Sequence, residues 1–160
     1  MLRRLLLTTN DWTLAVVRLV FGIVFFAHGA QKALGWFGGP GFSNMMTGFE
    51  RQGFPAIFAF LAICAEFLGG LGLLVGFLSR IAAFGIMCNM LVAIFTVHLH
   101  NGLFMNWTGN QGGEGFEFHL LALVICLTII VRGAGPLSID HFLTRHRPTH
   151  IRGFGKDHAA

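Results

Sequence analysis

Residues 56–77 read AIFAFLAICAEFLGGLGLLVGF, an apolar stretch whose single charged side chain is Glu66. A helix of about 20 apolar residues is long enough to cross the hydrocarbon core of a bilayer. Similar apolar stretches occupy residues 13–34, 80–99 and 116–133. The sequence therefore predicts an all-α, polytopic membrane protein that folds as a bundle of four transmembrane helices.

The composition indicates that lipid is the solvent for much of the chain. Of the 160 residues, 54% are hydrophobic and 11% are charged, whereas a soluble domain carries about 25% charged residues. A chain this short cannot bury so much apolar surface inside a water-soluble globule. The net charge of +4 comes from basic residues that flank the apolar spans, so we expect a lipid bilayer and no nucleic acid as the partner.

Lysine and arginine residues indicate the orientation of the bundle, because they concentrate on the cytoplasmic side. With the amino end inside, nine of the 11 basic residues lie on or near the inner side, and only Lys32 and Arg51 lie on the outer side. We therefore expect both termini in the cytoplasm. On this view residues 1–142 form the membrane domain of a multi-pass membrane protein, and residues 143–160 form a basic cytoplasmic tail.

The loop between the first two spans carries a helix signal of its own. Phe42, Met45, Met46 and Phe49 recur at positions i, i+3, i+4 and i+7. This spacing is typical of an amphipathic helix. We expect a short helix that lies on the outer surface of the membrane.

Ionisable side chains inside membrane spans are costly, and each needs a partner or a function. Arg18 lies in the first span, and Glu66 lies near the middle of the second. Helical rise places them about 9 Å apart in depth, a gap that an extended arginine could bridge. A structural Arg18–Glu66 ion pair is the favoured interpretation. A proton-handling carboxylate at Glu66 is the alternative.

Other polar residues share one depth, towards the predicted outer leaflet. Alternate spans run in opposite directions, so the first, third and fourth spans all contribute to this level. The residues at this depth are His28, Lys32, His98, His100, Glu117 and His119. Gln31 precedes Lys32, and Asn89 shares a helical stripe with His100. All of these side chains are candidate ligand contacts.

Three interpretations of this polar level stay open. The histidines could be structural, satisfied by neighbouring groups and headgroup water. They could line a pocket for a quinone or another small ligand, because imidazole and carboxylate groups hydrogen-bond carbonyl oxygens and move protons. His28, His98 and His119 could also hold a metal or a haem. No HxxxH or ExxH pairing within a span supports this third case, so we expect no metal, and haem is disfavoured.

The order and spacing of several motifs resemble a known family. Arg18–Gly22 and Phe26–Lys32 are similar to the first-helix signature of the DoxX family. Ala65–Gly70 and Gly76–Arg80 are similar to its second helix and the following turn. Gly133–Asp140 is similar to the glycine-rich ending after its fourth helix. The resemblance covers nearly the whole predicted membrane domain.

The resemblance implies a four-helix protein of the inner membrane. Some relatives are named for subunits of a thiosulfate:quinone oxidoreductase, and others are linked to membrane complexes that handle thiol or oxidative stress. The sequence contains no nucleotide-binding, flavin-binding or iron–sulfur motif. The expected electron acceptor is therefore a membrane quinone, and the redox cofactor is expected on a partner protein.

The favoured hypothesis is a membrane subunit or anchor of a quinone-linked oxidoreductase system, a component of an oxidoreductase without a cofactor of its own. In that role Glu66 and His28 are the candidates for proton or ligand contact, and Arg18 would orient or neutralise Glu66. One alternative is a small-solute or lipid-handling protein, which would act as a homo-oligomer. Another is a structural assembly partner without redox chemistry.

Overall fold

The fold is a bundle of helices, seen in a computed structural model that describes residues 2–145. Every regular element within that range is a helix, which confirms the predicted all-α class. Three of the described helices are long and apolar enough to cross a membrane: α2 (Trp12–Leu34), α4 (Ala56–Val75) and the continuous run Ser79–Asn101. The bundle therefore exposes its helices to a lipid bilayer, as the composition indicates.

The two longest helices begin and end at residues suited to those positions. Asp11 is the N-cap of α2, and its side chain accepts a hydrogen bond from the Leu14 N–H at 3.2 Å. Gly35 ends α2 with a left-handed φ of 74°, a conformation that glycine adopts without steric cost. Pro55 precedes α4, and Gly76 ends it with a φ of 67°.

The third long run changes its helical winding near one end. It starts as α5 (Ser79–Ala93), widens into the π-helical segment η2 (Ile94–His98) and closes with the short 3-10 turn η3 (Leu99–Asn101). A π-helical turn inside an α-helix is rare and is frequently found at functional sites. Here it carries His98, one of the candidate residues.

The fourth predicted span is shorter than expected. It is helix α6 (Glu117–Arg132), and its 16 residues reach about 24 Å, against a hydrocarbon core of about 30 Å. The predicted tail begins at residue 143, and its residues after Arg145 lie outside the described range. The remaining elements are α1 (Leu2–Leu6), η1 (Trp36–Gly38), α3 (Gly41–Arg51) and α7 (Ile139–Arg145). Helix α3 confirms the amphipathic helix predicted in the first loop.

Glycines bring α2 and α4 into close contact. A methyl group added at Gly29 would overlap the backbone of Phe67, and one added at Gly70 would overlap the backbone of Phe26. Small residues at such positions let two membrane helices approach closely. Because the two helices run in opposite directions, these contacts fix their register.

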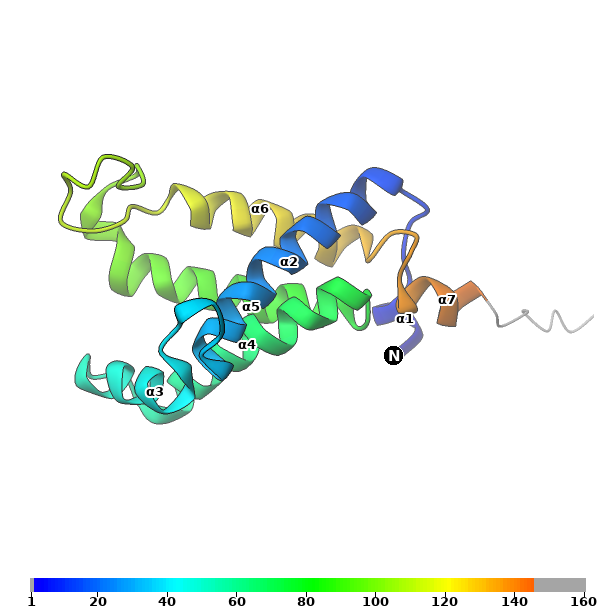
Figure 1. The fold of residues 1–160 in the computed structure, drawn as a ribbon. Coiled ribbons are helices and arrows are strands. Elements are labelled where there is room, and N and C mark those ends of the chain that lie inside the picture. The colour runs from blue at the N-terminus through cyan, green and yellow to red at the C-terminus, as the bar shows by residue number, and fades with distance from the viewer. Residues whose placement is uncertain (1, 146–160) are drawn as a thin grey trace, which may run out of the picture.

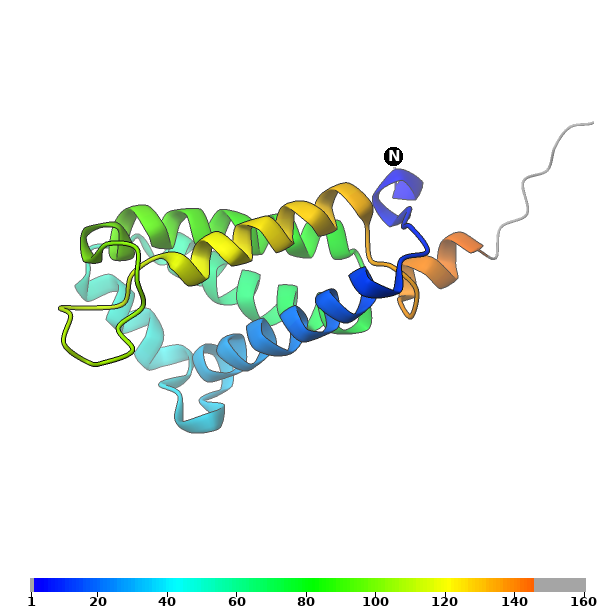
Figure 2. The same cartoon turned by 90° about the horizontal axis from the view of Figure 1, so that it is seen from above.

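The helices form a bundle with distinct ends (Figure 1). Helix α2 packs mainly on α4, α4 packs on α5, and α5 packs on α6, whereas α2 and α6 meet over a small area. Helices α1 and α7 contact each other at one end, which we call the terminal end. Helix α3 and the loop over residues 102–116 lie at the opposite end, which we call the loop end (Figures 1 and 2).

Apolar side chains occupy both the inside and the outside of the bundle. The core draws on α2, α4, α5 and α6 and consists of Leu14, Phe21, Phe25, Leu73, Ala83, Ile86, Met90, Ala122, Cys126 and Ile129. Large apolar side chains on the outer faces stay exposed, among them Val16, Val20 and Ile23 of α2. An apolar exterior of this extent is typical of a surface that contacts lipid.

Candidate functional site

A buried carboxylate on α4 is held by side chains from two other helices. Lys32 Nζ of α2 lies 2.5 Å from Glu66 Oε1 and 2.6 Å from Oε2. Asn89 Nδ2 of α5 donates a hydrogen bond of 2.9 Å to Oε1. The side chain of Glu66 is only 5% exposed, whereas that of Lys32 is 27% exposed. The three residues, which we call the Glu66 cluster, join three helices of the bundle.

The predicted Arg18–Glu66 ion pair is wrong, because Lys32 takes that place. In the close packing of α2 on α4, Gly29 faces Phe67, and Gly22 faces the backbone of Leu73 and Leu74. This antiparallel register places Lys32 within about 3 Å of Glu66 along the helix axis and leaves Arg18 about 18 Å away. An arginine side chain cannot span the second distance.

Arg18 instead binds backbone carbonyl groups at the terminal end. Its side chain is fully buried. Its guanidinium donates hydrogen bonds to the carbonyl oxygens of Leu73, of Leu74 at 3.0 Å, of Ala134 at 2.8 Å and of Leu137 at 2.9 Å. These contacts join the end of α4 to the segment between α6 and α7. This geometry therefore does not support a role for Arg18 in orienting Glu66.

Asp140 completes the polar contacts at the terminal end. Its carboxylate accepts hydrogen bonds from the backbone N–H groups of Leu78 at 2.8 Å and Ser79 at 3.0 Å. Its own N–H donates to the Gly76 carbonyl at 2.9 Å. Asp140 thus caps α5 from a distant part of the chain. In the sequence, Asp140 stands out only as part of the glycine-rich ending, and no local signal predicts its buried hydrogen bonds.

Two of the candidate histidines contact each other at the loop end. The ring centroids of His98 and His119 lie 4.1 Å apart. His119 is buried, with 7% exposure, and its Nδ1 has no hydrogen-bond partner among the described residues. Within residues 2–145, no group of three or more His, Cys, Asp or Glu side chains could hold a metal ion.

Comparison with known proteins agrees with the sequence motifs. The DoxX family model matches residues 13–99, more than half of the chain. This chain belongs to the DoxX family. It is 30% identical over 128 residues to a Bacillus subtilis (strain 168) protein named "Putative oxidoreductase CatD", covering 80% of this chain and 84% of that one. The resemblance stated from the sequence is thereby confirmed.

A second relative was found among known sequences, whereas the comparison with solved structures found none. An uncharacterized protein of Haemophilus influenzae is 27% identical over 143 residues, which cover 86% of this chain and 87% of that protein. No solved structure matches this DoxX chain. The Glu66 cluster lies within the matched residues 13–99, whereas His119 lies beyond them.

The remaining candidate residues of this DoxX protein are not part of the Glu66 cluster. His28 and His100 are exposed, and neither side chain makes a hydrogen bond to another described residue. Gln31 donates a long hydrogen bond of 3.4 Å to the Phe37 carbonyl. Glu117 accepts one of 3.1 Å from Trp107 Nε1 in the loop over residues 102–116.

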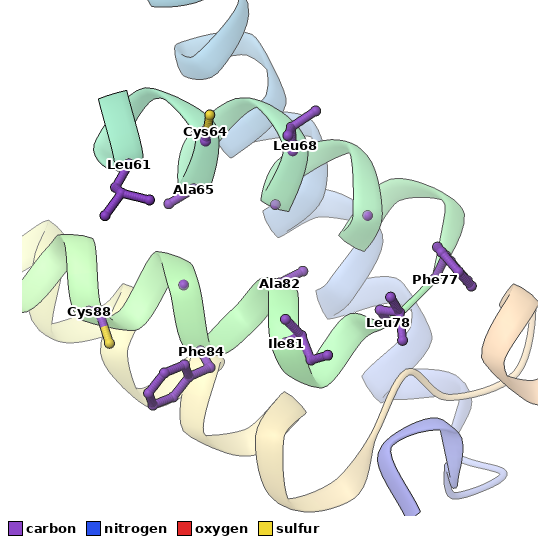
Figure 3. A pocket seen from close by; sticks show the side chains of 13 residues that line it. Leu61, Cys64, Ala65, Leu68, Phe77, Leu78, Ile81, Ala82, Phe84 and Cys88 are labelled. Atoms are coloured by element: carbon purple, nitrogen blue, oxygen red, sulfur yellow. The ribbon is translucent and has the colours of Figure 1, made fainter. Parts of the chain in front are cut away.

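An apolar groove lies between α4 and α5 (Figure 3). Its volume is about 530 Å³, and small residues such as Ala65, Gly69 and Gly85 form much of its lining. Two thiols, Cys64 and Cys88, also border it. None of the candidate site residues lines this groove. The groove and the Glu66 cluster are therefore separate features.

Proposed function

We propose that this DoxX protein is an inner-membrane subunit or anchor of a quinone-linked oxidoreductase system, and that its Glu66 cluster contacts the quinone. The observation that carries the proposal is the buried carboxylate of Glu66, which is paired with Lys32 inside an apolar bundle. Ionisable groups in such a position are expensive and mark ligand, ion or proton sites. The name of the Bacillus subtilis relative supports the class of chemistry.

The side chains of the cluster suit a ligand with carbonyl oxygens. Lys32 Nζ and Asn89 Nδ2 are hydrogen-bond donors, and a carbonyl oxygen is an acceptor. Glu66 can hold or release a proton beside them. A quinone supplies a carrier of two electrons and two protons when it binds. Lys32 and Asn89 would hold its oxygens, and the electron donor would belong to a partner protein.

The proposed topology has four spans, with α6 as the fourth. Helices α1 and α7 contact each other at the terminal end, and this contact supports an even number of crossings between them. Leu121, Val124 and Val131 of α6 are exposed, so this helix also presents an apolar face. A span about 24 Å long fits a bilayer that thins locally at modest cost. The distribution of basic residues then supports cytoplasmic termini.

A lipid-handling role is the second candidate, and the groove between α4 and α5 is the observation that favours it. The groove is almost wholly apolar and about 530 Å³ in volume, enough for part of an acyl chain. A lipid that stays bound during purification, and that is lost when Gly85 is replaced by Leu, would support this role in place of the quinone.

Extraction of bound lipids from gently purified protein tests the proposal. We expect a quinone in the extract of the wild-type protein and its loss in the Glu66→Gln variant. Glu50→Gln is the matched control, because Glu50 is exposed on α3 and lies outside the cluster. Wild-type protein that neither retains quinone nor binds added quinone would overturn the proposed function.

A further inference from the structure

The groove between α4 and α5 adjoins a second hollow, which two arginines line. This second hollow, which we call the basic hollow, has a volume of about 380 Å³. Residues of α1, α5 and α6 line it: Arg4, Leu5, Arg80, Ile81, Phe84 and Ile130. Ile81 and Phe84 of α5 also line the groove (Figure 3). An apolar hollow and a basic hollow therefore share a border.

The groove extends from the terminal end towards the middle of the bundle. Phe77 and Leu78 line it where α4 passes into α5, and its lining on α4 continues from Gly72 back to Leu61. That stretch of α4 is about 16 Å long, close to half of a hydrocarbon core of about 30 Å. The groove therefore matches the depth of one lipid leaflet, the leaflet at the terminal end.

The two arginines of the basic hollow lack an acidic partner. The side chain of Arg4 is exposed on α1 and makes no hydrogen bond or ion pair with any residue from 2 to 145. Arg80 is half-buried, and its guanidinium donates to the carbonyl oxygens of Leu7 at 2.9 Å, of Ile130 and of Val131 at 3.1 Å. These bonds fix the guanidinium of Arg80 but leave its charge without a described carboxylate.

The acidic residues of the terminal end are bound elsewhere. Asp11 pairs with Arg132 at 3.1 Å, and Asp140 accepts hydrogen bonds from the backbone of Leu78 and Ser79. The other described acidic residues lie on α3, in the middle of α4 and at the loop end: Glu50, Glu66, Glu114 and Glu117. The charge of the basic hollow therefore needs an anion from outside residues 2–145.

We propose that the terminal end binds one anionic phospholipid, with its phosphate in the basic hollow and one acyl chain in the groove. Guanidinium groups bind phosphate oxygens through charge-assisted hydrogen bonds, and basic pockets between membrane helices hold anionic headgroups. A free phosphate would leave the groove empty, and an uncharged quinone would leave the arginines unpaired. This inference is independent of the quinone at the Glu66 cluster, and it names the lipid class for the groove of the second candidate role.

Titration of phospholipids into the full chain in mild detergent, followed by native mass spectrometry, tests the proposal. Dioleoylphosphatidylglycerol is the anionic probe, and dioleoylphosphatidylcholine has the same acyl chains without a net charge. We expect one phosphatidylglycerol per chain, bound at least about fivefold more tightly than phosphatidylcholine, the effect of one basic residue near an anionic lipid. Equal affinities for the two lipids would overturn the proposal.

Arg3 and Arg4 provide a matched pair of variants. Both are exposed on α1, but only Arg4 lines the basic hollow. We expect Arg4→Gln to weaken the binding of phosphatidylglycerol about fivefold and Arg3→Gln to leave it unchanged. Both variants keep Arg80 and its bonds to carbonyl groups, so both should fold. Equal affinities in the two variants would indicate a diffuse attraction to basic residues and would overturn the site.

A larger side chain at Gly85 tests the acyl-chain part of the site. A carbon added at Gly85 would lie 3.8 Å from Cβ of Ala65, an ordinary contact, and the rest of a leucine would occupy the groove. We expect Gly85→Leu to weaken the binding of phosphatidylglycerol at least about fivefold. Gly48→Leu is the control, because nothing lies within 4 Å of the carbon added there. Wild-type affinity in Gly85→Leu would overturn the role of the groove.

Glycerol phosphate gives a second test of the groove, which holds even if Gly85→Leu does not fold. This compound has the phosphate without acyl chains, so it should not displace bound phosphatidylglycerol at equal concentration. Displacement would show that the headgroup alone binds and would overturn the proposal.

The absence of quinone from this assay keeps its result separate from the proposed function. A wild-type protein that binds phosphatidylglycerol as expected, but no quinone, would reject the quinone site alone. A protein that binds quinone and has equal affinities for the two phospholipids would reject the phospholipid site alone.

Discussion

The ammonium group of Lys32 on α2 contacts both carboxylate oxygens of Glu66 on α4, at 2.5 and 2.6 Å. The pair sits where the two helices are closest, near the glycine contacts that set their register. A buried ion pair adds little net stability, because desolvation offsets most of the attraction. Removal of only one of the two charged side chains is costly, since the remaining charge is left without a partner.

Replacement of Lys32 by Met should therefore destabilise the protein by about 3 kcal/mol. The double variant Lys32→Met/Glu66→Leu should recover most of this loss, because neither charge then remains in the interior. Chemical unfolding in detergent micelles measures both variants. Arg51→Met is the control, since Arg51 is exposed on α3. A Lys32→Met variant as stable as the wild type would show that the pair does not form.

A methyl group at Gly29 should separate α2 from α4. The added carbon would overlap the Phe67 backbone, and overpacking of this kind costs about 1–3 kcal/mol. We expect Gly29→Ala to lower the thermal unfolding temperature. Gly48→Ala is the matched control, because Gly48 lies in α3 with nothing within 4 Å of the added carbon. Equal unfolding temperatures for the two variants would contradict the packing of α2 on α4.

Lysine should be a poor substitute for Arg18 at the terminal end. The guanidinium of Arg18 binds carbonyl groups of Leu73, Leu74, Ala134 and Leu137. The single ammonium group of lysine has three donors and cannot reproduce this planar arrangement. We expect Arg18→Lys to cost about 2 kcal/mol, the loss of one or two hydrogen bonds to a charged group. Unfolding of Arg18→Lys next to Arg51→Lys measures this loss, and equal stabilities would exclude the role.

Much of the fold could be predicted from the sequence. Apolar runs of about 20 residues give long helices regardless of their neighbours, and Asp11, Gly35 and Pro55 mark their ends at short range. The amphipathic spacing of Phe42 to Phe49 was enough for α3. Local signals of this kind depend on a few neighbouring residues, so a single sequence is enough to recognise them.

The pairing of side chains could not be predicted in the same way. Arg18 and Lys32 both lie on the α2 face that contacts α4, and the choice between them depends on how far α2 slides along α4. That register comes from the backbone contacts at Gly22, Gly29 and Gly70, and a count of residues from the span ends does not contain it. The same limitation hid Asp140, whose partners lie more than 60 residues away.

The candidate histidines fall into two groups, a pair in contact with each other and a pair that is exposed. His98, which contacts His119, lies within the π-helical segment η2, and an ideal helical wheel does not include such a change of winding. His28 and His100 lie at the same predicted depth but are exposed. Shared depth therefore identified a set of candidate residues, whereas the direction of each side chain decided which of them contact one another.

Quinone affinity of the Asn89→Leu variant tests the central claim most directly, because this change removes a donor to Glu66 and leaves the Lys32–Glu66 pair in place. Titration of a short-chain quinone into protein in nanodiscs, followed by tryptophan fluorescence, gives the Kd. We predict that Asn89→Leu raises the Kd about fivefold to tenfold, the value of one hydrogen bond, while Glu50→Gln leaves it unchanged. Wild-type affinity in both Asn89→Leu and Glu66→Gln would contradict a ligand site at the Glu66 cluster.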